Sequence, residues 1–429
     1  MVQVHINFRK AELESLADLY NLKTIDFSNY SRDSPFFIVE LENDKQAQDW
    51  IKRSILTKAI YEYWGEGTTY EELHKSIQAN PNYEAYKAQF RDDSFKFEFE
   101  SYRGSPSGNS NRVQIIESFQ YLDFQGKIRL KNPDQVFTVI EEYEPINDNV
   151  AGEKPLRIFF GRRVQQSDRI MGALEKYDLK KRPYKGTTSF EAELSLVSAN
   201  IAQVKPGTFM YDPFAGTGSF LVAGGHYGAV VLGSDIDGRM IRGKGSQTIK
   251  ANFKKYGESL QFLDVLTMDF THNAIRNDLI VDTILCDPPY GIRESIKVLG
   301  ARNPEKFIGK ENVEIDGQKA YLHRDYIPTK KPYALDALLD DLLEYASKKL
   351  PLHGRLAFWM PTANDENVET VVPMHPNLEL KYNCVQEFNR WSRRLLVYIN
   401  RGADYNGVNN AGLQRTTGNF RERYFNGFN

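Results

Sequence analysis

Cysteine is almost absent from this chain of 429 residues, which contains Cys286 and Cys384 and no others. Two cysteines are too few for a disulfide framework or a zinc cluster, so we expect a reducing compartment and predict a cytoplasmic protein. The seven histidines are scattered without metal-ligand spacing, and no metal site is predicted. No apolar run reaches the roughly 18 residues of a membrane span, and the N-terminus lacks the pattern of a secretory signal.

An excess of charge of one sign is missing as well, because the formal net charge is −2. The chain therefore has no general attraction to nucleic acid, and any surface that binds it must be local. The 41% hydrophobic and 26% charged content is that of an ordinary soluble globular protein. Since 429 residues exceed one typical hydrophobic core, we expect two to three domains.

The first part of the chain alternates strand-like and helix-like runs. Strands are expected over 4–8 and 36–41, and helices over 10–20 and 44–64. Together they predict a small ferredoxin-like α+β domain over residues 1–64. This domain by itself indicates no chemistry.

A second α+β domain is predicted over residues 65–165. Its last part, GKIRLKNPDQVFTVIEEY (126–143) followed by RIFFGRRV (157–164), resembles the end of a THUMP domain, an RNA-binding module of tRNA-modifying enzymes. The resemblance implies that residues 65–165 are such a domain. A generic α+β accessory domain is the alternative.

A basic segment follows. Residues 151–190 contain ten Lys or Arg against four Asp or Glu, interleaved with aromatic residues. This balance suits a surface that follows RNA phosphates beside stacking rings, although a solvated connector is an equal alternative. We predict a basic linker over 166–190. The candidate RNA-binding residues are Arg162, Arg163, Lys180, Lys181 and Arg182.

Residues 191–401 repeat a strand–helix alternation that predicts an α/β domain with a doubly wound, mainly parallel Rossmann-like sheet. In such sheets the ligand site lies at the carboxyl ends of the strands. Residues 402–429 are rich in Gly and Asn without an apolar period, which predicts a flexible tail. The expected strands are 208–212, 229–235, 260–264, 283–287 and 356–361, closed by an antiparallel pair at 378–388 and 394–400.

Asp287-Pro288-Pro289-Tyr290, after the apolar run 281–286, is the stretch that indicates chemistry most directly. Each proline fixes its φ and lacks an N–H, so the turn is stiff and its carbonyls do not compete for local donors. The loop can present a carboxylate, a backbone acceptor and a flat ring to a planar amine. Because the lone pair of a nucleobase amine is delocalised, two acceptors on its hydrogens favour a tetrahedral, nucleophilic nitrogen.

A second motif, DPFAGTGSF over 212–220, joins a predicted strand to a predicted helix. Gly216 and Gly218 let a ligand approach the backbone closely, yet the spacing is neither G-x-G-x-x-G nor a Walker loop. Asp212 at the strand tip instead favours a ligand with a cationic end, such as the amino group of S-adenosylmethionine.

Two further carboxylates extend this candidate site. Asp235 stands where a ribose-binding carboxylate belongs, with Asp237 as its rival. Asp264 is expected to end the third strand and to accept a hydrogen bond from the adenine amine.

The ordered set DPFAGTGSF, GSDID, FLD and DPPY resembles the class I S-adenosylmethionine-dependent methyltransferases that act on exocyclic amines of nucleobases. LKKRPYKGTTSFEAEL (179–194), GSDIDGRMIRG (233–243) and DPPYGIRE (287–294) make the likeness closer. Over essentially the whole chain, the sequence resembles the catalytic subunits of the eukaryotic tRNA (guanosine-10-N2)-methyltransferases, which are THUMP-domain enzymes. The resemblance implies tRNA as substrate, S-adenosyl-L-methionine as cofactor, and a heterodimer with a small zinc-binding activator subunit.

The same resemblance implies roles for individual residues. Asp287 would accept a hydrogen bond from the guanine amine, the Pro288 carbonyl would hold its second hydrogen, and Tyr290 would stack on the base. Asp235 would hold the ribose and Asp264 the adenine. The methionine part of the cofactor would be lined by Asp212, Ala215, Gly216 and Gly218. Thr188, Ser189 and Phe190 would close over it.

Several alternatives stay open at this point. Thr188 and Ser189 suit a helix cap equally well, and Phe190 suits the core. The insertion over 295–332 is either a loop that grips the substrate or a spacer. An adenine-N6 methyltransferase on RNA or DNA would use the same loop chemistry, and a non-catalytic tRNA-binding scaffold would carry a vestigial cofactor pocket.

Overall fold

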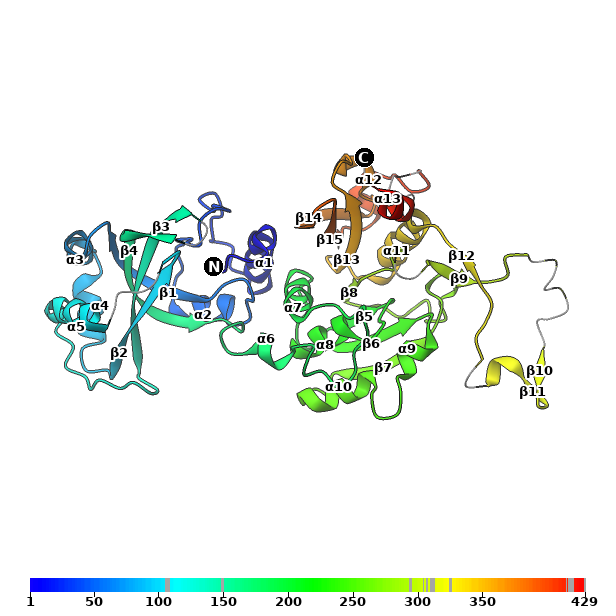
Figure 1. Ribbon diagram of the computed structural model, residues 1–429, viewed down its shortest axis with the longest axis horizontal. Coiled ribbons are helices and arrows are strands. Elements are labelled where there is room, and N and C mark those ends of the chain that lie inside the picture. Colours follow the sequence, from blue (N-terminus) through cyan, green and yellow to red (C-terminus); the bar gives the residue numbers. More distant parts are fainter. Residues whose placement is uncertain are drawn as a thin grey trace. The chain divides into compact units, whose positions relative to one another are not determined.

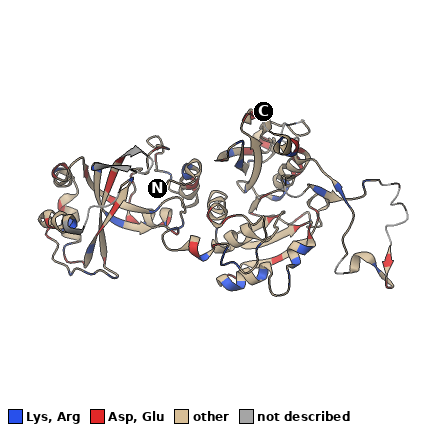
Figure 2. Cartoon of the chain, in the orientation of Figure 1, with Lys and Arg blue, Asp and Glu red and all other residues tan. Residues whose placement is uncertain are grey.

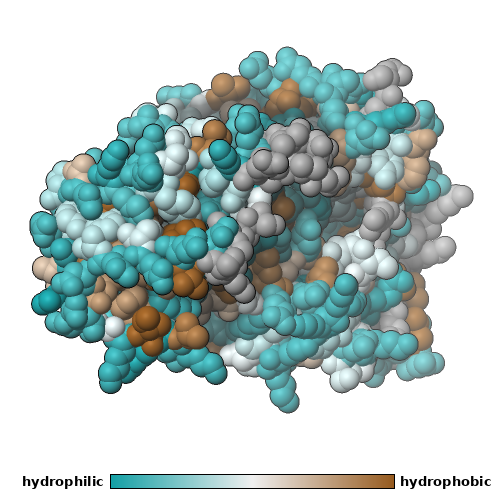
Figure 3. Space-filling model, turned by 60° about the vertical axis from the view of Figure 1, so that its left-hand side comes forward, coloured by the Kyte–Doolittle hydropathy of each residue, from teal (hydrophilic) through white to brown (hydrophobic). Residues whose placement is uncertain are grey.

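The computed structural model describes residues 1–104, 109–147, 150–292, 295–303, 305, 308, 313–323, 326–413, 415 and 420–427. The chain forms two compact units. The smaller unit contains Leu41–Lys52 and Thr57–Met171, and the larger unit contains Met1–Glu40, Arg53–Leu56 and Gly172–Asn429. The face drawn in Figure 3 is mostly hydrophilic with scattered apolar patches. Among the described helices, none has the length and apolar character needed to cross a membrane.

A seven-stranded sheet forms the centre of the larger unit, in the order β14-β15-β13-β8-β5-β6-β7 (Figure 1). Strands β13, β8, β5, β6 and β7 pair in parallel, whereas β15 pairs antiparallel with β13 and β14. The predicted doubly wound, Rossmann-like sheet is therefore confirmed. The strands are β5 (Phe209–Asp212), β6 (Val230–Asp235), β7 (Phe262–Thr267), β8 (Thr283–Cys286), β13 (Arg355–Ala363), β14 (Leu378–Glu387) and β15 (Trp391–Asn400).

Two apolar cores cover the two faces of this sheet. The side chains of successive β13 residues point alternately into one core and the other. Trp359 joins the core that contains α1, α7, α8 and α10, whereas Phe358 joins the core that contains α11. The helices of the unit are α1 (Ile6–Leu19), α6 (Ala173–Lys176), α7 (Ala192–Ile201), α8 (Ser219–His226), α9 (Gly238–Arg242), α10 (Ile249–Tyr256), α11 (Leu335–Lys349), α12 (Val368–Val371) and α13 (Phe420–Asn426).

The smaller unit contains a four-stranded sheet in the order β1-β4-β3-β2. Aromatic rings fill its core, where the Trp64 ring lies 5.0 Å from Tyr86 and 5.3 Å from Phe137, measured between ring centroids. Its elements are α2 (Asp44–Ile51), β1 (Ala59–Gly67), α3 (Tyr70–Ala79), α4 (Tyr83–Gln89), β2 (Phe95–Tyr102), α5 (Asn109–Ser118), β3 (Gln135–Asn147) and β4 (Val150–Gln166).

The insertion over 295–332 lies partly outside the described residues. Its described part contains two short antiparallel pairs, β9 (Lys297–Leu299) with β12 (Lys330–Pro332) and β10 (Glu314–Ile315) with β11 (Gln318–Lys319). In the described part of the chain, 3-10 turns lie at Gln120–Leu122, Phe270–His272, Ala320–Leu322 and Ala403–Tyr405.

The prediction for residues 1–64 is wrong in most of its elements. A helix begins at Ile6 instead of a strand, residues 36–41 form no strand, and the predicted helix over 44–64 ends at Ile51. Residues 59–67 instead form strand β1, which pairs antiparallel with β4. The segment is divided between the two units, so it does not form a separate ferredoxin-like domain.

The N-terminal helix α1 instead packs onto the sheet of the larger unit. Phe8 is fully buried, and its ring stacks on Trp359 of β13 at a centroid distance of 5.6 Å. At the edge of the sheet, the Asn7 amide nitrogen donates to the Val385 carbonyl at 2.9 Å. The first residues of the chain thus complete a core whose other residues, apart from Ile55 and Leu56, follow position 172.

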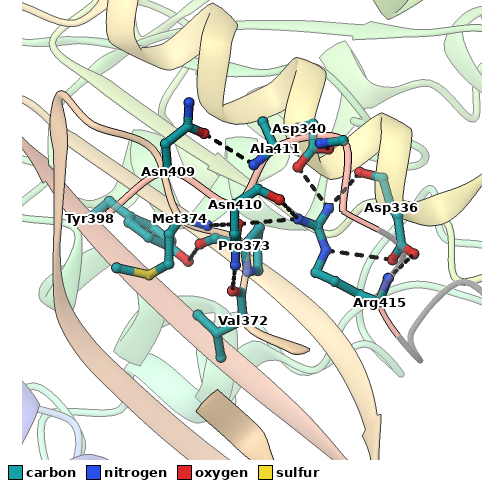
Figure 4. Close-up of polar contacts among 11 residues, drawn as sticks. Asp336, Asp340, Val372, Pro373, Met374, Tyr398, Asn409, Asn410, Ala411 and Arg415 are labelled. Atoms are coloured by element: carbon teal, nitrogen blue, oxygen red, sulfur yellow. Dashed lines mark hydrogen bonds and ion pairs between the residues drawn. The ribbon is translucent and has the colours of Figure 1, made fainter. Parts of the chain in front are cut away.

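The prediction of a flexible tail over 402–429 is also wrong for the described residues. Arg415 is only 3% exposed, and its guanidinium pairs with Asp336 and Asp340 of α11 (Figure 4). The Asn410 side chain donates to the Val372 carbonyl and accepts from the Met374 N–H, at 2.9 and 2.7 Å. Specific polar contacts therefore fix a segment whose composition is typical of disorder.

Glu12 on α1 provides a test of how the N-terminal segment is held. Its buried carboxylate accepts hydrogen bonds from the Ser54 hydroxyl, the Ile55 and Leu56 N–H groups and the Asn200 side chain, at 2.7–2.9 Å. Glu12→Gln replaces one carboxylate oxygen with an amide NH2 group, which donates and therefore faces buried donors that it cannot accept from. The substitution is expected to lower the free energy of unfolding by about 2–3 kcal/mol in urea denaturation.

The matched control is Glu14→Gln on the same helix. Glu14 makes a partly exposed 3.6 Å ion pair with Lys10, which is expected to contribute less than about 0.5 kcal/mol. An equal loss in both variants would contradict the assigned role of Glu12.

Candidate active site

Three carboxylates meet at the carboxyl edge of the sheet. Asp212 ends β5, Asp235 ends β6, and Asp287 follows β8 directly. Asp212 is 1% exposed, and burial followed by the charges of Asp235 and Asp287 raises its pKa well above the usual value. Among the described residues, no cation forms an ion pair with Asp212. The edge therefore favours a ligand that brings positive charge.

The glycine loop after β5 is fastened to Asp235. The Gly216 N–H donates to one carboxylate oxygen of Asp235 at 2.9 Å, and the Asp237 N–H donates to the other at 2.8 Å. Gly216 and Gly218 have φ of +50° and +82°, a conformation that favours glycine. A Cβ at Gly216 would meet nothing within 4 Å, whereas one at Gly218 would approach Ile249. The loop thus borders open space beside the carboxylates.

The segment before α7 contacts this loop. The Ser189 hydroxyl lies 2.6 Å from that of Thr217, and the Phe190 N–H donates to the Ser219 hydroxyl at 3.1 Å. Phe190 is buried against Phe220 and Trp359. Helix α7 begins at Ala192 with Glu191 before it, so neither Thr188 nor Ser189 caps it. Thr188 is exposed at the surface of this cover.

The position predicted for Asp264 is wrong. Strand β7 continues to Thr267, so Asp264 lies inside it, exposed and three residues before its carboxyl end. A register shift opposite Val231 and Leu232 leaves Leu263 as an extra residue, a β-bulge that sequence periodicity does not reveal.

The carboxylate that does follow β7 at the edge is Asp269, which sequence reasoning missed. It is 4% exposed and accepts hydrogen bonds from the Thr271 N–H at 3.0 Å and the Leu299 N–H at 2.7 Å. Asp269 lies two residues beyond the end of β7, in Met268-Asp269-Phe270. A correct prediction of the strand end would have identified it as the carboxylate at the edge of the sheet.

Asp287 is half-buried and tied to its own loop. The Tyr290 hydroxyl donates to its carboxylate. Burial raises the pKa of Asp287 to about 6, while the Tyr290 hydrogen bond and the positive charge of Arg393 act in the opposite direction. Burial and the neighbouring Asp287 raise the pKa of Tyr290, which stays protonated. Near neutral pH the loop therefore presents an ionised, weakly basic acceptor.

Arg393 on β15 completes this environment. Its guanidinium lies over the rings of Phe190 and Trp359, at 4.5 and 5.3 Å from their centroids, and donates to the Gln386 side chain. The position of Arg393 beside Asp287 is visible only in the fold, because the two residues are far apart in the sequence.

Three of the five candidate RNA-binding residues are buried or half-buried and make internal contacts. Arg162 pairs with Asp44 and Glu62, and Arg163 pairs with Glu98 at 2.5 Å. Arg182 is 4% exposed and donates to the Ser219 hydroxyl. These side chains stabilise their own units and are not displayed for phosphates.

Lys180 and Lys181 are exposed, and Lys181 pairs with Glu175. They adjoin α10, because the Lys255 amine donates to the Lys181 carbonyl. Figure 2 shows the resulting accumulation of basic residues on α9 and α10. This lysine face contains the exposed residues Lys180, Lys181, Lys185, Arg239, Lys244, Lys250, Lys254 and Lys255.

The carboxyl edge suits S-adenosylmethionine on two observations. Asp212 is a buried carboxylate without a cation in the described part of the chain, and the cofactor carries both an ammonium and a sulfonium group. Gly216 faces open space where a side chain would intrude. Asp212, Gly216 and Gly218 would hold the methionine part of the cofactor, with Ser189 and Phe190 in the segment that contacts this loop.

Comparison with known proteins agrees with this assignment. The family model described as "Tmrp11 THUMP N-terminal domain" matches residues 1–169, and that described as "RMKL-like, methyltransferase domain" matches residues 180–299. These matches and the relatives below confirm the resemblance that the motifs indicate.

The tRNA (guanine(10)-N(2))-methyltransferase of Saccharomyces cerevisiae is 74% identical over 431 residues, covering 100% of this chain and 98% of that protein. The protein of the same name from Schizosaccharomyces pombe is 38% identical, covering 91% and 81% respectively. The human tRNA (guanine(10)-N(2))-methyltransferase TRMT11 is 34% identical, covering 100% and 94%.

Gly216 and Gly245 form a matched pair for testing the cofactor site. Both have positive φ, +50° and +59°, and a Cβ at either would meet nothing within 4 Å. Gly216→Ala is expected to weaken binding of S-adenosylhomocysteine by at least about tenfold in calorimetry, or 1.4 kcal/mol, because the methyl group enters the ligand space.

Gly245→Ala is expected to cause a similar backbone strain and to leave the affinity unchanged. Equal affinities for both variants would place the cofactor elsewhere.

Proposed function

The chain belongs to the tRNA (guanine(10)-N2)-methyltransferase family, and from the site that it carries we infer that it methylates the exocyclic N2 amine of guanosine 10 in tRNA. The methyl donor is S-adenosylmethionine. The observation that carries the inference is the Asp287-Pro288-Pro289-Tyr290 loop beside Asp212 and Asp235, at the carboxyl edge of the sheet.

The cofactor supplies an electrophilic methyl group on a positively charged sulfur. Asp212 provides a buried negative charge, and the loop at Gly216 and Gly218 provides backbone without side chains. Asp235 is the candidate for the ribose hydroxyls and also fixes the Gly216 N–H. Asp269 replaces Asp264 as the candidate carboxylate near the adenine, because Asp269 follows the strand at the site edge.

Asp287 accepts a hydrogen bond from the guanine amine in the proposed mechanism, and the Pro288 carbonyl accepts the second hydrogen. With both hydrogens held by acceptors, the nitrogen lone pair is drawn out of conjugation with the ring. As the nitrogen forms its new bond it becomes positively charged, and the Asp287 carboxylate stabilises this charge or takes the proton. Tyr290 orients the carboxylate through its hydroxyl and offers its ring to the base.

The target base must leave its helical stack to reach this loop, as in other enzymes that act on nucleobases. For the tRNA backbone, the lysine face defined above is the candidate contact in the larger unit, because it is exposed and carries mainly positive charge. Lys180 and Lys181 of the original prediction belong to it.

A small zinc-binding activator subunit is the proposed partner, on the strength of the resemblance. Edge strand β7 supports this proposal, because it pairs on only one side among the described strands and exposes Leu263 (56%) and Leu266 (38%) beside Leu260 (92%). An unpaired edge with exposed leucines needs cover, which a partner strand supplies by β-augmentation. The expected compartment is the cytoplasm, and exclusive nuclear localisation of the tagged chain would contradict this.

The identity of the methylated nucleoside tests the function. The chain, with and without the activator subunit, is incubated with unmodified tRNA and labelled S-adenosylmethionine, and the tRNA is digested to nucleosides. Label is expected in N2-methylguanosine, with a loss of about 10²–10⁴-fold in Asp287→Asn because the neutral amide cannot take up the developing charge.

The exposed control Asp278→Asn is expected to retain full activity. Label in N6-methyladenosine would overturn the guanine assignment, and tRNA binding without any label would favour the scaffold. Activity that is independent of the added subunit would contradict the heterodimer.

The pH dependence of the reaction reports on the charge of Asp287. Because its pKa is about 6 and the ionised form is required, kcat/KM is expected to rise as the pH passes through this value. Tyr290→Phe removes a hydrogen bond that favours the carboxylate, so the pKa rises and the acidic limb moves to higher pH. The charges of Arg393 and Asp212 also act on this carboxylate, and both residues are retained in the Tyr290→Phe variant.

The measurement is kcat/KM between about pH 5 and pH 9, with the exposed Tyr405→Phe as the control. An acidic limb at the same pH in Tyr290→Phe and wild type would show that Asp287 is not the titrating group.

A further inference from the structure

The C-terminal helix α13 is held by two anchors within the larger unit. Phe420 is fully buried, and its ring packs edge-on against Trp391 of β15 at a centroid distance of 5.8 Å. Arg423 forms ion pairs with Asp365 at 2.6 Å and Glu366 at 2.5 Å. The helix is short, but an apolar side chain and a charged one together fix its position.

The chain that precedes this helix is also anchored. Arg415 is buried between Asp336 and Asp340 of α11, and the Gly412 N–H donates to Asp340 at 2.8 Å (Figure 4). The C-terminal segment is thus attached to the sheet unit upstream of α13 as well as at α13 itself.

Arg421, between the two anchors of α13, reaches the loop of the active site. Its guanidinium donates to the Gly291 carbonyl at 2.5 Å, across 130 residues of sequence. The Arg421 side chain passes 3.8 Å from the position that a Cβ at Gly291 would take. Gly291 directly follows Tyr290, so this contact holds the end of the Asp287–Tyr290 loop.

Packing holds part of this loop, since Pro288 is buried and the Tyr290 ring lies against the core that contains Trp359, but its backbone has few hydrogen-bond donors. Pro288 and Pro289 have no N–H to donate, and Gly291 has φ of +79°, a conformation with little steric restraint in glycine. The Tyr290 hydroxyl holds the carboxylate of Asp287, but it restrains Asp287 and Tyr290 only relative to each other. A charged donor on the Gly291 carbonyl adds a restraint from outside the loop.

We propose that Arg421 is a positioning residue of the methyltransferase, which fixes the Asp287–Gly291 loop through the Gly291 carbonyl. The C-terminal segment is accordingly a part of the active site. The proposal rests on the proposed function and extends it to a residue outside the motifs. Arg421 acts through the orientation of Asp287 and the Pro288 carbonyl, since both acceptors must face one amine.

The exposure of Arg421 separates this role from a structural one. The residue is exposed, so removing its side chain opens no cavity, whereas Phe420 and Arg423 carry the attachment of the helix. The loss of Arg421 is therefore expected to affect loop order and rate, and to leave the overall stability nearly unchanged.

Arg421→Ala and Arg421→Lys in the full chain, with the activator subunit present, test the proposal. In single-turnover assays with saturating tRNA and S-adenosylmethionine, Arg421→Ala is expected to slow methyl transfer about tenfold, as loss of a hydrogen bond from a charged donor does. The KM for the cofactor is expected to change less than about twofold. Arg421→Lys is expected to recover part of the rate, because its amine can also donate to the carbonyl.

Glu422→Ala is the matched control, since Glu422 is the exposed neighbour on the same helix. It is expected to keep the wild-type rate. Hydrogen–deuterium exchange in the peptide covering residues 287–292 is expected to accelerate in Arg421→Ala and to stay unchanged in Glu422→Ala, while the Tm of both stays within about 1 °C of wild type.

A wild-type rate for Arg421→Ala would overturn the proposal, as would a rate loss accompanied by a fall in Tm and no recovery in Arg421→Lys. The exchange measurement needs no substrate. If the wild-type chain failed to methylate tRNA, the proposed function would fail, while unchanged exchange in Arg421→Ala would still be a separate failure of the positioning role.

Discussion

Negative charge concentrated at one edge of the sheet is the constraint on which the larger unit depends. Parallel strands bring their carboxyl ends to the same edge, so Asp212, Asp235 and Asp287 are held near one another. Their mutual repulsion and desolvation are offset by donors that the surrounding loops direct at them: the N–H groups of Phe214, Gly216 and Asp237 and the Tyr290 hydroxyl. The loops take a shape that directs these donors at the carboxylates. A cationic ligand would reduce the remaining repulsion between the carboxylates.

The sequence predicted the features that depend on neighbouring residues. A short apolar run that ends in a carboxylate is a local pattern, and it located β5, β6 and β8 with the acidic residue at each end. The error at Asp264 has a different origin, because the β-bulge at Leu263 is set by pairing with β6. Pairing partners are not visible in a single strand, so the strand end and Asp269 were missed.

The other wrong predictions concern charged and polar residues. The partner of such a residue can lie anywhere in the chain, so a local pattern does not reveal it. Arg162 suggested a phosphate contact, but its partner Asp44 lies 118 residues earlier. Arg415 and Asn410 lie in a segment with the composition of a disordered tail, yet Arg415 pairs with Asp340 of α11 and Asn410 accepts a hydrogen bond from the Met374 N–H. Composition describes a segment on average, whereas one buried ion pair can fix it.

The smaller unit lies in the sequence between parts of the larger one, and this connectivity has a consequence for biosynthesis. Helix α1 is made first, but its packing partner Trp359 is made some 350 residues later. During translation the Phe8 surface therefore has to wait, exposed or held by a chaperone, while the inserted unit folds. A fragment that starts at residue 172 would carry the complete seven-stranded sheet and still lack α1, which is part of the cover of one face. The two parts of this protein are consequently separable as compact bodies but not as simple consecutive fragments.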